Sequence, residues 1–178
     1  MISCTEFIPS YSLFFSWLDE TAGHDKVLEY WKYISDNYLD MLENAVREKG
    51  IFGCWEYWKH SLNEEAADFV QELYLNEDGT GKFSIDMRYC PSKGRLLEYS
   101  HFTPYYDYCS HCPALYPPML ERYGLRGIAD MDRVDEAACG ETYYMDNPPA
   151  PEIAAAGWKA ALEELATGEG ITGSLTEK

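Results

Sequence analysis

The chain has 178 residues, of which 46% are hydrophobic, and it carries 14 Lys and Arg against 31 Asp and Glu. The resulting net charge of −17 repels phosphate backbones and anionic lipid surfaces, so we set aside nucleic-acid and membrane partners. No run of about 18 apolar residues predicts a membrane-spanning helix, and the first fifteen residues hold Glu6 but no basic residue of a secretory signal. We therefore expect a cytoplasmic protein.

The first third of the chain has the periodicity of helices. Residues 24–49 are predicted to form one helix that ends at Gly50, with a shorter helix at 11–19 before it. A further helix is expected at 52–60, and Ser61 with Glu64 is typical of a new helix start. The apolar face of the long helix recurs every three or four residues, at Val27, Trp31, Ile34, Tyr38, Met41 and Ala45.

The middle of the chain changes to an alternating pattern. Residues 69–75 and 83–89 are predicted to be the two strands of a hairpin, because 76–81 between them has turn composition. Two more strands are expected at 126–132 and 138–145.

The remaining helices are predicted at 95–99, at 106–123 before Gly124, and at 153–165. Helices that bracket two strand pairs favour an α+β fold. We expect an antiparallel sheet of about four strands packed against an N-terminal helical region and flanking helices.

The length fits a single domain over residues 1–166. Within it we expect a helical part at 1–66, a cysteine-rich α+β core at 67–146 and a C-terminal helix at 150–166. Residues 167–178 are expected to be a flexible tail.

Six cysteines stand in the chain, and Cys109 and Cys112 form a C-x-x-C pair. In a reducing compartment clustered cysteines indicate metal or redox chemistry rather than disulfides. Two thiolates three residues apart can hold one ion, and Cys90 and Cys139 would complete a tetrahedral zinc site. His101 and His111 are additional nitrogen ligands.

The same four cysteines are compatible with other interpretations. Four thiolates also hold an iron–sulfur cluster, and a C-x-x-C pair can be a redox dithiol. They can equally be plain reduced thiols in a partly buried region. A closed zinc site would make the chain a non-enzymatic module that needs the metal to fold.

A nucleophilic enzyme needs a thiolate, a base and an orienting group. Cys139 is the predicted nucleophile, with His111 or His101 as its base and Glu141, Asp86 or Asp107 as the orienting group. Tyrosines combine a large ring with a hydroxyl and suit a half-polar pocket wall. The predicted wall consists of Tyr105, Tyr106 and Tyr143.

The segment from about residue 69 to 145 resembles the L-2-amino-thiazoline-4-carboxylate hydrolase-like family. The resemblance rests on a strand that ends in Cys90-Pro91, a Tyr- and Cys-bearing helix from Tyr106, and a last strand with Cys139 before Tyr143 and Tyr144. It implies hydrolytic opening of a small heterocycle or amide. The family's cysteine positions correspond to Cys90, Cys109 and Cys139.

Two positions depart from that family pattern. Gly140 separates Cys139 from Glu141, where an acidic residue directly after the cysteine is expected, and Cys112 stands where an Asp is expected. The added thiol favours metal or cluster binding. The sequence thus predicts a small hydrolase with a cysteine-rich, metal-binding site, and a zinc module or an iron–sulfur redox protein is the alternative.

Overall fold

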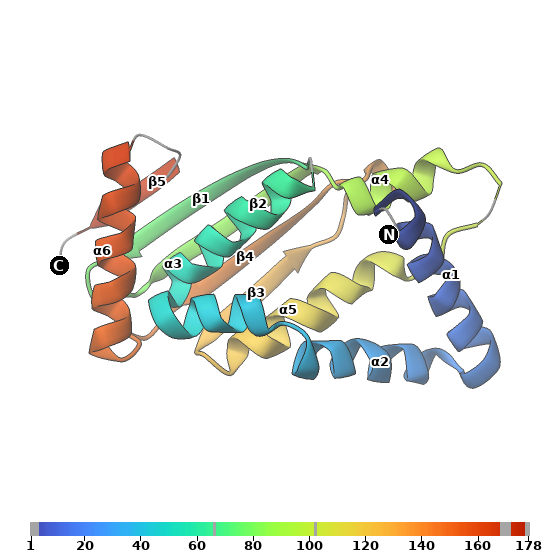
Figure 1. The fold of residues 1–178 in the computed structure, drawn as a ribbon, viewed down its shortest axis with the longest axis horizontal. Coiled ribbons are helices and arrows are strands. Elements are labelled where there is room, and N and C mark those ends of the chain that lie inside the picture. Colours follow the sequence, from blue (N-terminus) through green and yellow to red (C-terminus); the bar gives the residue numbers. More distant parts are fainter. Residues whose placement is uncertain (1–3, 66, 102, 168–171, 177–178) are drawn as a thin grey trace.

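The computed structural model describes residues 4–65, 67–101, 103–167 and 172–176, and it combines helices with a single sheet, as the sequence predicts (Figure 1). The helices are α1 Cys4–Ala22, α2 His24–Asn37, α3 Asp40–Glu64, α4 Pro91–Glu98, α5 His111–Glu121 and α6 Pro151–Thr167. The strands are β1 Asp68–Asn76, β2 Gly81–Tyr89, β3 Leu125–Asp130, β4 Cys139–Met145 and β5 Thr172–Thr176. Among the described residues, no helix has the length and apolar character needed to cross a membrane.

The sheet has five strands in the order β3-β4-β2-β1-β5. The four predicted strands are present and pair antiparallel. The expectation of a purely antiparallel sheet is wrong, because β5 pairs in parallel with β1. Residues 172–176, which lie within the expected flexible tail, form a strand at the edge of β1, where their backbone groups are satisfied. The rest of that tail after Thr167 lies outside the described residues.

The hairpin of β1 and β2 follows the predicted turn chemistry. The Asp78 carboxylate accepts hydrogen bonds from the Thr80 backbone N–H (3.1 Å) and hydroxyl (2.6 Å). Gly79 adopts φ 82°, a left-handed conformation that favours glycine. The turn therefore sets the register in which Leu73 faces Phe83.

The predicted helix over residues 24–49 is divided in two. α2 ends at Asn37 and α3 begins at Asp40. Val27 and Trp31 are buried as predicted, but Tyr38 and Met41 are 77% and 69% exposed. The apolar period continues through the break, so the sequence pattern alone does not reveal it.

Gly50 interrupts α3 where the sequence predicts a helix end. Its backbone is non-helical, with φ 58° and ψ −137°, so α3 consists of two helical segments that meet in a kink at this residue. Ser61 does not start a new helix, because α3 continues to Glu64. Buried Ile51, Phe52 and Trp55 follow the kink and anchor the second segment in the core.

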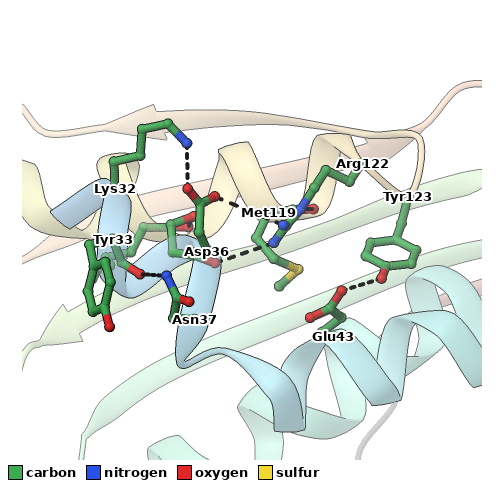
Figure 2. Close-up of polar contacts among 10 residues, drawn as sticks. Lys32, Tyr33, Asp36, Asn37, Glu43, Met119, Arg122 and Tyr123 are labelled. Atoms are coloured by element: carbon green, nitrogen blue, oxygen red, sulfur yellow. Dashed lines mark hydrogen bonds and ion pairs between the residues drawn. The ribbon is translucent and has the colours of Figure 1, made fainter. Parts of the chain in front are cut away.

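Side chains on α2, α3 and the segment after α5 join these elements (Figure 2). The Arg122 guanidinium donates to the Ser35 backbone carbonyl at 3.3 Å and lies 4.0 Å from the Asp36 carboxylate. The Tyr123 hydroxyl donates to the Glu43 carboxylate. The Ser35 hydroxyl is buried and donates to the Leu115 carbonyl at 2.7 Å. These bonds fix α5 against the helical region.

The interior consists of two hydrophobic cores. The larger lies between α3 and the sheet, where Trp58 stacks on Phe83 and Tyr143 with ring centroids 5.9 and 5.3 Å away. The smaller joins α1, α2 and α4 around Phe15 and Trp31. Figure 1 shows the sheet at one end of the molecule and α1, α2 and α4 at the other.

The contact between α6 and α3 depends on Gly157. A Cβ added there would lie 2.5 Å from the Lys49 carbonyl oxygen. Gly157→Ala should therefore destabilise the fold by about 1–3 kcal/mol through overpacking, although alanine favours helices. The measurement is urea unfolding.

Ala155→Gly at an exposed position of α6 calibrates the helix-propensity effect. If Gly157→Ala instead raises the free energy of unfolding by as much as Ala155→Gly lowers it, the close approach of α6 to α3 does not constrain position 157.

Candidate functional site

Four thiols gather where the two cores meet, and we call Cys90, Cys109, Cys112 and Cys139 the cysteine cluster. Each of the four lies within electrostatic range of the other three. The five cysteines whose side chains the structure describes are unpaired thiols. Of these five, Cys54 is separate and buried in the larger core.

Backbone geometry brings the cysteine cluster together. Cys90 ends β2 and its N–H donates to the Ala137 carbonyl at 2.7 Å, which places it near the start of β4. Cys139 opens β4 opposite Met87. Cys109 lies in a short 3-10 turn, Tyr108–Ser110, directly before α5, so the predicted helix over 106–123 begins only at His111. The C-x-x-C pair spans this junction.

Burial raises the pKa of every thiol in the cysteine cluster, and neighbouring thiols add to the shift at Cys109, Cys112 and Cys139. The pKa of Cys109 rises to about 11 and that of Cys139 to about 12. Burial raises the pKa of Cys112 well above its usual value, and the nearby charge of Glu141 raises it further. At neutral pH these groups are therefore neutral thiols.

Cys90 is the N-cap of α4, and its sulfur accepts a hydrogen bond from the Lys93 backbone N–H at 3.5 Å. This bond, a second from the Ser92 N–H and the Lys93 charge all oppose the effect of burial. Burial still dominates, so the pKa of Cys90 is raised.

His111 and Cys112 form a hydrogen-bonded pair. The backbone carbonyl of Tyr108 contacts Nδ1 of His111, and a carbonyl can only accept, so Nδ1 carries the proton. Nε2 then accepts, and Sγ of Cys112 lies 3.4 Å from it. A thiol, a base and a group that orients the base therefore lie in contact here, which is the set of groups that a nucleophilic site requires.

Aromatic rings surround the imidazole of His111. The ring centroid of Tyr108 lies 4.8 Å from that of His111, and those of Tyr11, Phe15 and Trp31 lie 6.0, 6.4 and 6.5 Å away. Burial among these rings lowers the pKa of His111, so the imidazole is neutral and able to accept a proton.

Glu141 lies on the same face of β4 as Cys139, two residues along. Burial raises its pKa to about 7, and the Tyr143 hydroxyl opposes this by donating to its carboxylate at 2.5 Å. Glu141 also lies within electrostatic range of Cys112 and Cys139. A buried carboxyl that titrates near neutrality can donate or accept a proton.

The structure does not bring all predicted site residues together. Tyr143 lies in the larger core, whereas Tyr105 and Tyr106 border a separate hollow of about 460 Å³ with Asp19. The buried Tyr105 hydroxyl donates to Asp19 at 3.0 Å and lies 2.9 Å from Nδ1 of His24. The expected tyrosine wall is therefore not formed as one surface.

The predicted bases and orienting groups are similarly dispersed. His101 is exposed and its ring lies 5.2 Å from that of Tyr99. Asp86 is paired with Arg133 at 2.6 Å on the opposite face of the sheet. Asp107 lies 3.6 Å from Nε2 of His24. From the sequence, Cys112 is predicted to be a metal ligand or half of a redox dithiol, and His111 is predicted to be a base for Cys139 rather than for Cys112.

The donors of the cysteine cluster suit a soft cation, but their spacing does not. Among residues 4–65, 67–101, 103–167 and 172–176, no three Cys, His, Asp or Glu side chains converge closely enough to hold a metal ion. The zinc site and the iron–sulfur site of the sequence analysis stay predictions, and we derive no chemical step through a metal.

Comparison with models of known protein families gave no match, and searches of curated proteins and of solved structures gave none either. The resemblance to the thiazoline-carboxylate hydrolase-like family therefore stays a prediction from the sequence.

The raised pKa of Glu141 makes stability depend on pH. Below pH 4.5 the carboxyl is protonated in both folded and unfolded chains. Between pH 4.5 and about 7 the unfolded chain loses its proton first, so the folded state loses stability as pH rises, by roughly 3 kcal/mol in total. Glu141→Gln should remove this component.

Urea unfolding at pH 5 and pH 8, with and without Glu141→Gln, measures the effect. Glu65 also has a raised pKa and is retained in both chains, so the difference between the two profiles isolates Glu141. Parallel profiles would contradict a carboxyl that titrates near neutrality.

Proposed function

We propose that the chain is a thiol-dependent hydrolase of a small amide or cyclic amidine, with Cys112 as nucleophile and His111 as base. The observation that carries the proposal is the 3.4 Å contact from Cys112 Sγ to His111 Nε2, in the tautomer that the Tyr108 carbonyl selects. The substrate class comes from the sequence resemblance around Cys90, Cys109 and Cys139.

The first half-reaction uses a neutral thiol. Cys112 passes its proton to Nε2 of His111 as its sulfur bonds to the carbonyl or amidine carbon. The tetrahedral adduct then collapses, the C–N bond breaks, and the leaving nitrogen takes the proton from the imidazolium. Glu141, which is protonated below its pKa of about 7, is a second proton donor within electrostatic range of the sulfur.

The second half-reaction restores the thiol. Nε2 of His111 takes a proton from water as the water oxygen attacks the thioester or thioimidate carbon. The carbon–sulfur bond breaks, and the sulfur of Cys112 recovers the proton from the imidazolium. The aromatic rings around His111 keep the base neutral between turnovers.

Acyl trapping tests this proposal without knowledge of the natural substrate. With p-nitrophenyl acetate the chain should release one equivalent of nitrophenolate in a burst and gain one acetyl group at Cys112. Cys112→Ala should lose the burst. His111→Asn should slow it by about 100-fold or more, because the general base is lost. Peptide mass mapping and stopped-flow absorbance are the measurements.

The matched control is Cys109→Ala, which removes a thiol of the same cluster three residues away and should retain the burst. Circular dichroism melts verify that each variant folds. A burst that persists in Cys112→Ala, with the acetyl group on Cys139, would assign the nucleophile to the position that the sequence predicted.

Zinc binding by the cysteine cluster is the second candidate function. It is favoured because thiols of the cluster raise the pKa values of their neighbours, as Cys90 does for Cys109, Cys112 and Cys139, a repulsion that a bound cation would relieve. Zinc would then require the thiols to move inward and lose their protons.

Elemental analysis of anaerobically purified protein tests this second function. One zinc per chain, lost in Cys90→Ser and accompanied by a lower melting temperature after chelation, is the expected result. Iron with visible absorbance indicates the iron–sulfur alternative. If the purified protein contains no metal and chelation leaves its melting temperature unchanged, zinc binding is ruled out and the thiol hydrolase is the one proposal that stands.

A further inference from the structure

The face of the sheet opposite the cysteine cluster is hollowed. The concavity measures about 500 Å³, and we call it the sheet-face hollow. Its lining comes from β1, β2, β3 and β4 together with Arg133, and no residue of the described helices contributes. A volume of this size falls within the range of small-molecule sites, roughly 300–1,000 Å³.

One register row crosses the floor of the sheet-face hollow. Glu72 on β1 lies opposite Ser84 on β2, which lies opposite Thr142 on β4, and Ile128 on β3 completes the row. Over the part of the chain that the structure describes, the Glu72 carboxylate and the two hydroxyls have no hydrogen-bond or ion-pair partner. Three polar groups on adjacent strands therefore line one concavity, and none has a protein partner among the described residues.

Lys82 stands in the next row, diagonal to Glu72. Its ammonium lies 5.8 Å from the centroid of the Tyr74 ring and has no carboxylate partner among the described residues. Because diagonal positions on neighbouring strands are roughly 7–8 Å apart, the opposite charges of Lys82 and Glu72 are separated rather than paired.

The opposite end of the sheet-face hollow is fixed by an ion-pair group. Arg133 and Arg88 both bind Asp86, at 2.6 and 3.7 Å. Gly140 leaves the floor open beside them, because a Cβ there would meet only ordinary van der Waals contacts at 3.6 Å. The charged groups at this end are thus paired with one another, whereas Lys82 and Glu72 lie at the other end without an ion-pair partner among the described residues.

We propose that the sheet-face hollow binds a small zwitterion, with its carboxylate on Lys82 and its ammonium on Glu72. Ser84 and Thr142 bond to the body of the ligand between these two charges, and Ile128 contacts its apolar part. The arrangement is a charge complement: a separated cation and anion on the protein match a separated anion and cation on the ligand. It is independent of the thiol chemistry proposed for the cysteine cluster.

NMR titration of the ¹⁵N-labelled full chain tests this site. The probes are 5-aminopentanoate, a zwitterion, with pentanoate and pentylamine as single-charge controls of similar length. We expect saturable amide shifts in β1, β2 and β4 with the zwitterion, and at least about tenfold weaker binding of either control, because each loses a charge-assisted bond.

Lys82→Met and Glu72→Gln should each weaken zwitterion binding by about tenfold, whereas Lys32→Met on α2 and Glu152→Gln on α6 should leave it unchanged. Gly140→Leu places a side chain over the floor of the sheet-face hollow and should abolish the amide shifts. If the Gly140→Leu variant does not fold, Lys82→Met still tests the site.

Three results would overturn the proposal. The first is the absence of amide shifts at this face up to about 20 mM probe, a limit set by weak-ligand affinity. The others are equal binding of pentanoate and the zwitterion, and amide shifts that depend on protein concentration alone. The last result would assign this face to a second copy of the chain. Because the acyl-trapping burst does not involve this face, each proposal can fail without the other.

Discussion

The packing of Trp58 against Phe83 and Tyr143 is the contact on which the arrangement of the site depends. The three rings fix α3 over the neighbouring strands β2 and β4, and so decide which face of the sheet is covered. Side chains alternate between the two faces of a strand. Once Tyr143 is on the covered face, Glu141 and Cys139 are on it as well. The burial that raises their pKa values is therefore a consequence of the core, and Gly140 and Thr142 are directed to the open face for the same reason.

The position of the cysteine cluster between two hydrophobic cores explains its electrostatics. Cys109 packs against the smaller core, and Met87, opposite Cys139, packs against the larger one. Few cations reach this boundary: Lys93 and Arg133 lower thiol pKa values there, but less than burial raises them. Thiols in such surroundings react only when a neighbouring base removes the proton, and His111 is the base in contact with one of them. The aromatic rings around His111 keep it in the neutral form that this role requires.

Most of the fold was predictable from local patterns. Alternation in residues 69–75 and 83–89, with turn residues between, was sufficient for the hairpin, and the strands β3 and β4 were found in the same way. The failures share a cause. The break between α2 and α3 and the addition of β5 depend on contacts between distant segments. For the candidate site, the sequence correctly grouped Cys90, Cys109, Cys112 and Cys139 in one region. It paired His111 with Cys139, whereas the structure places His111 against Cys112. A local sequence pattern does not show whether an imidazole contacts its neighbour in the chain or a distant residue.

By itself the sequence determined the charge of the chain, the positions of most helices and strands, and the residue types of the candidate site. These properties follow from composition and from periodicities of two and 3.6 residues, which are local. Only the tertiary structure decided which groups meet. It joined Cys112 to His111 and gave Glu141 a pKa of about 7, and it left Lys82 and Glu72 unpaired on an open face. Distances, burial and charge separation arise from packing between segments far apart in the chain, and a one-dimensional pattern does not contain them.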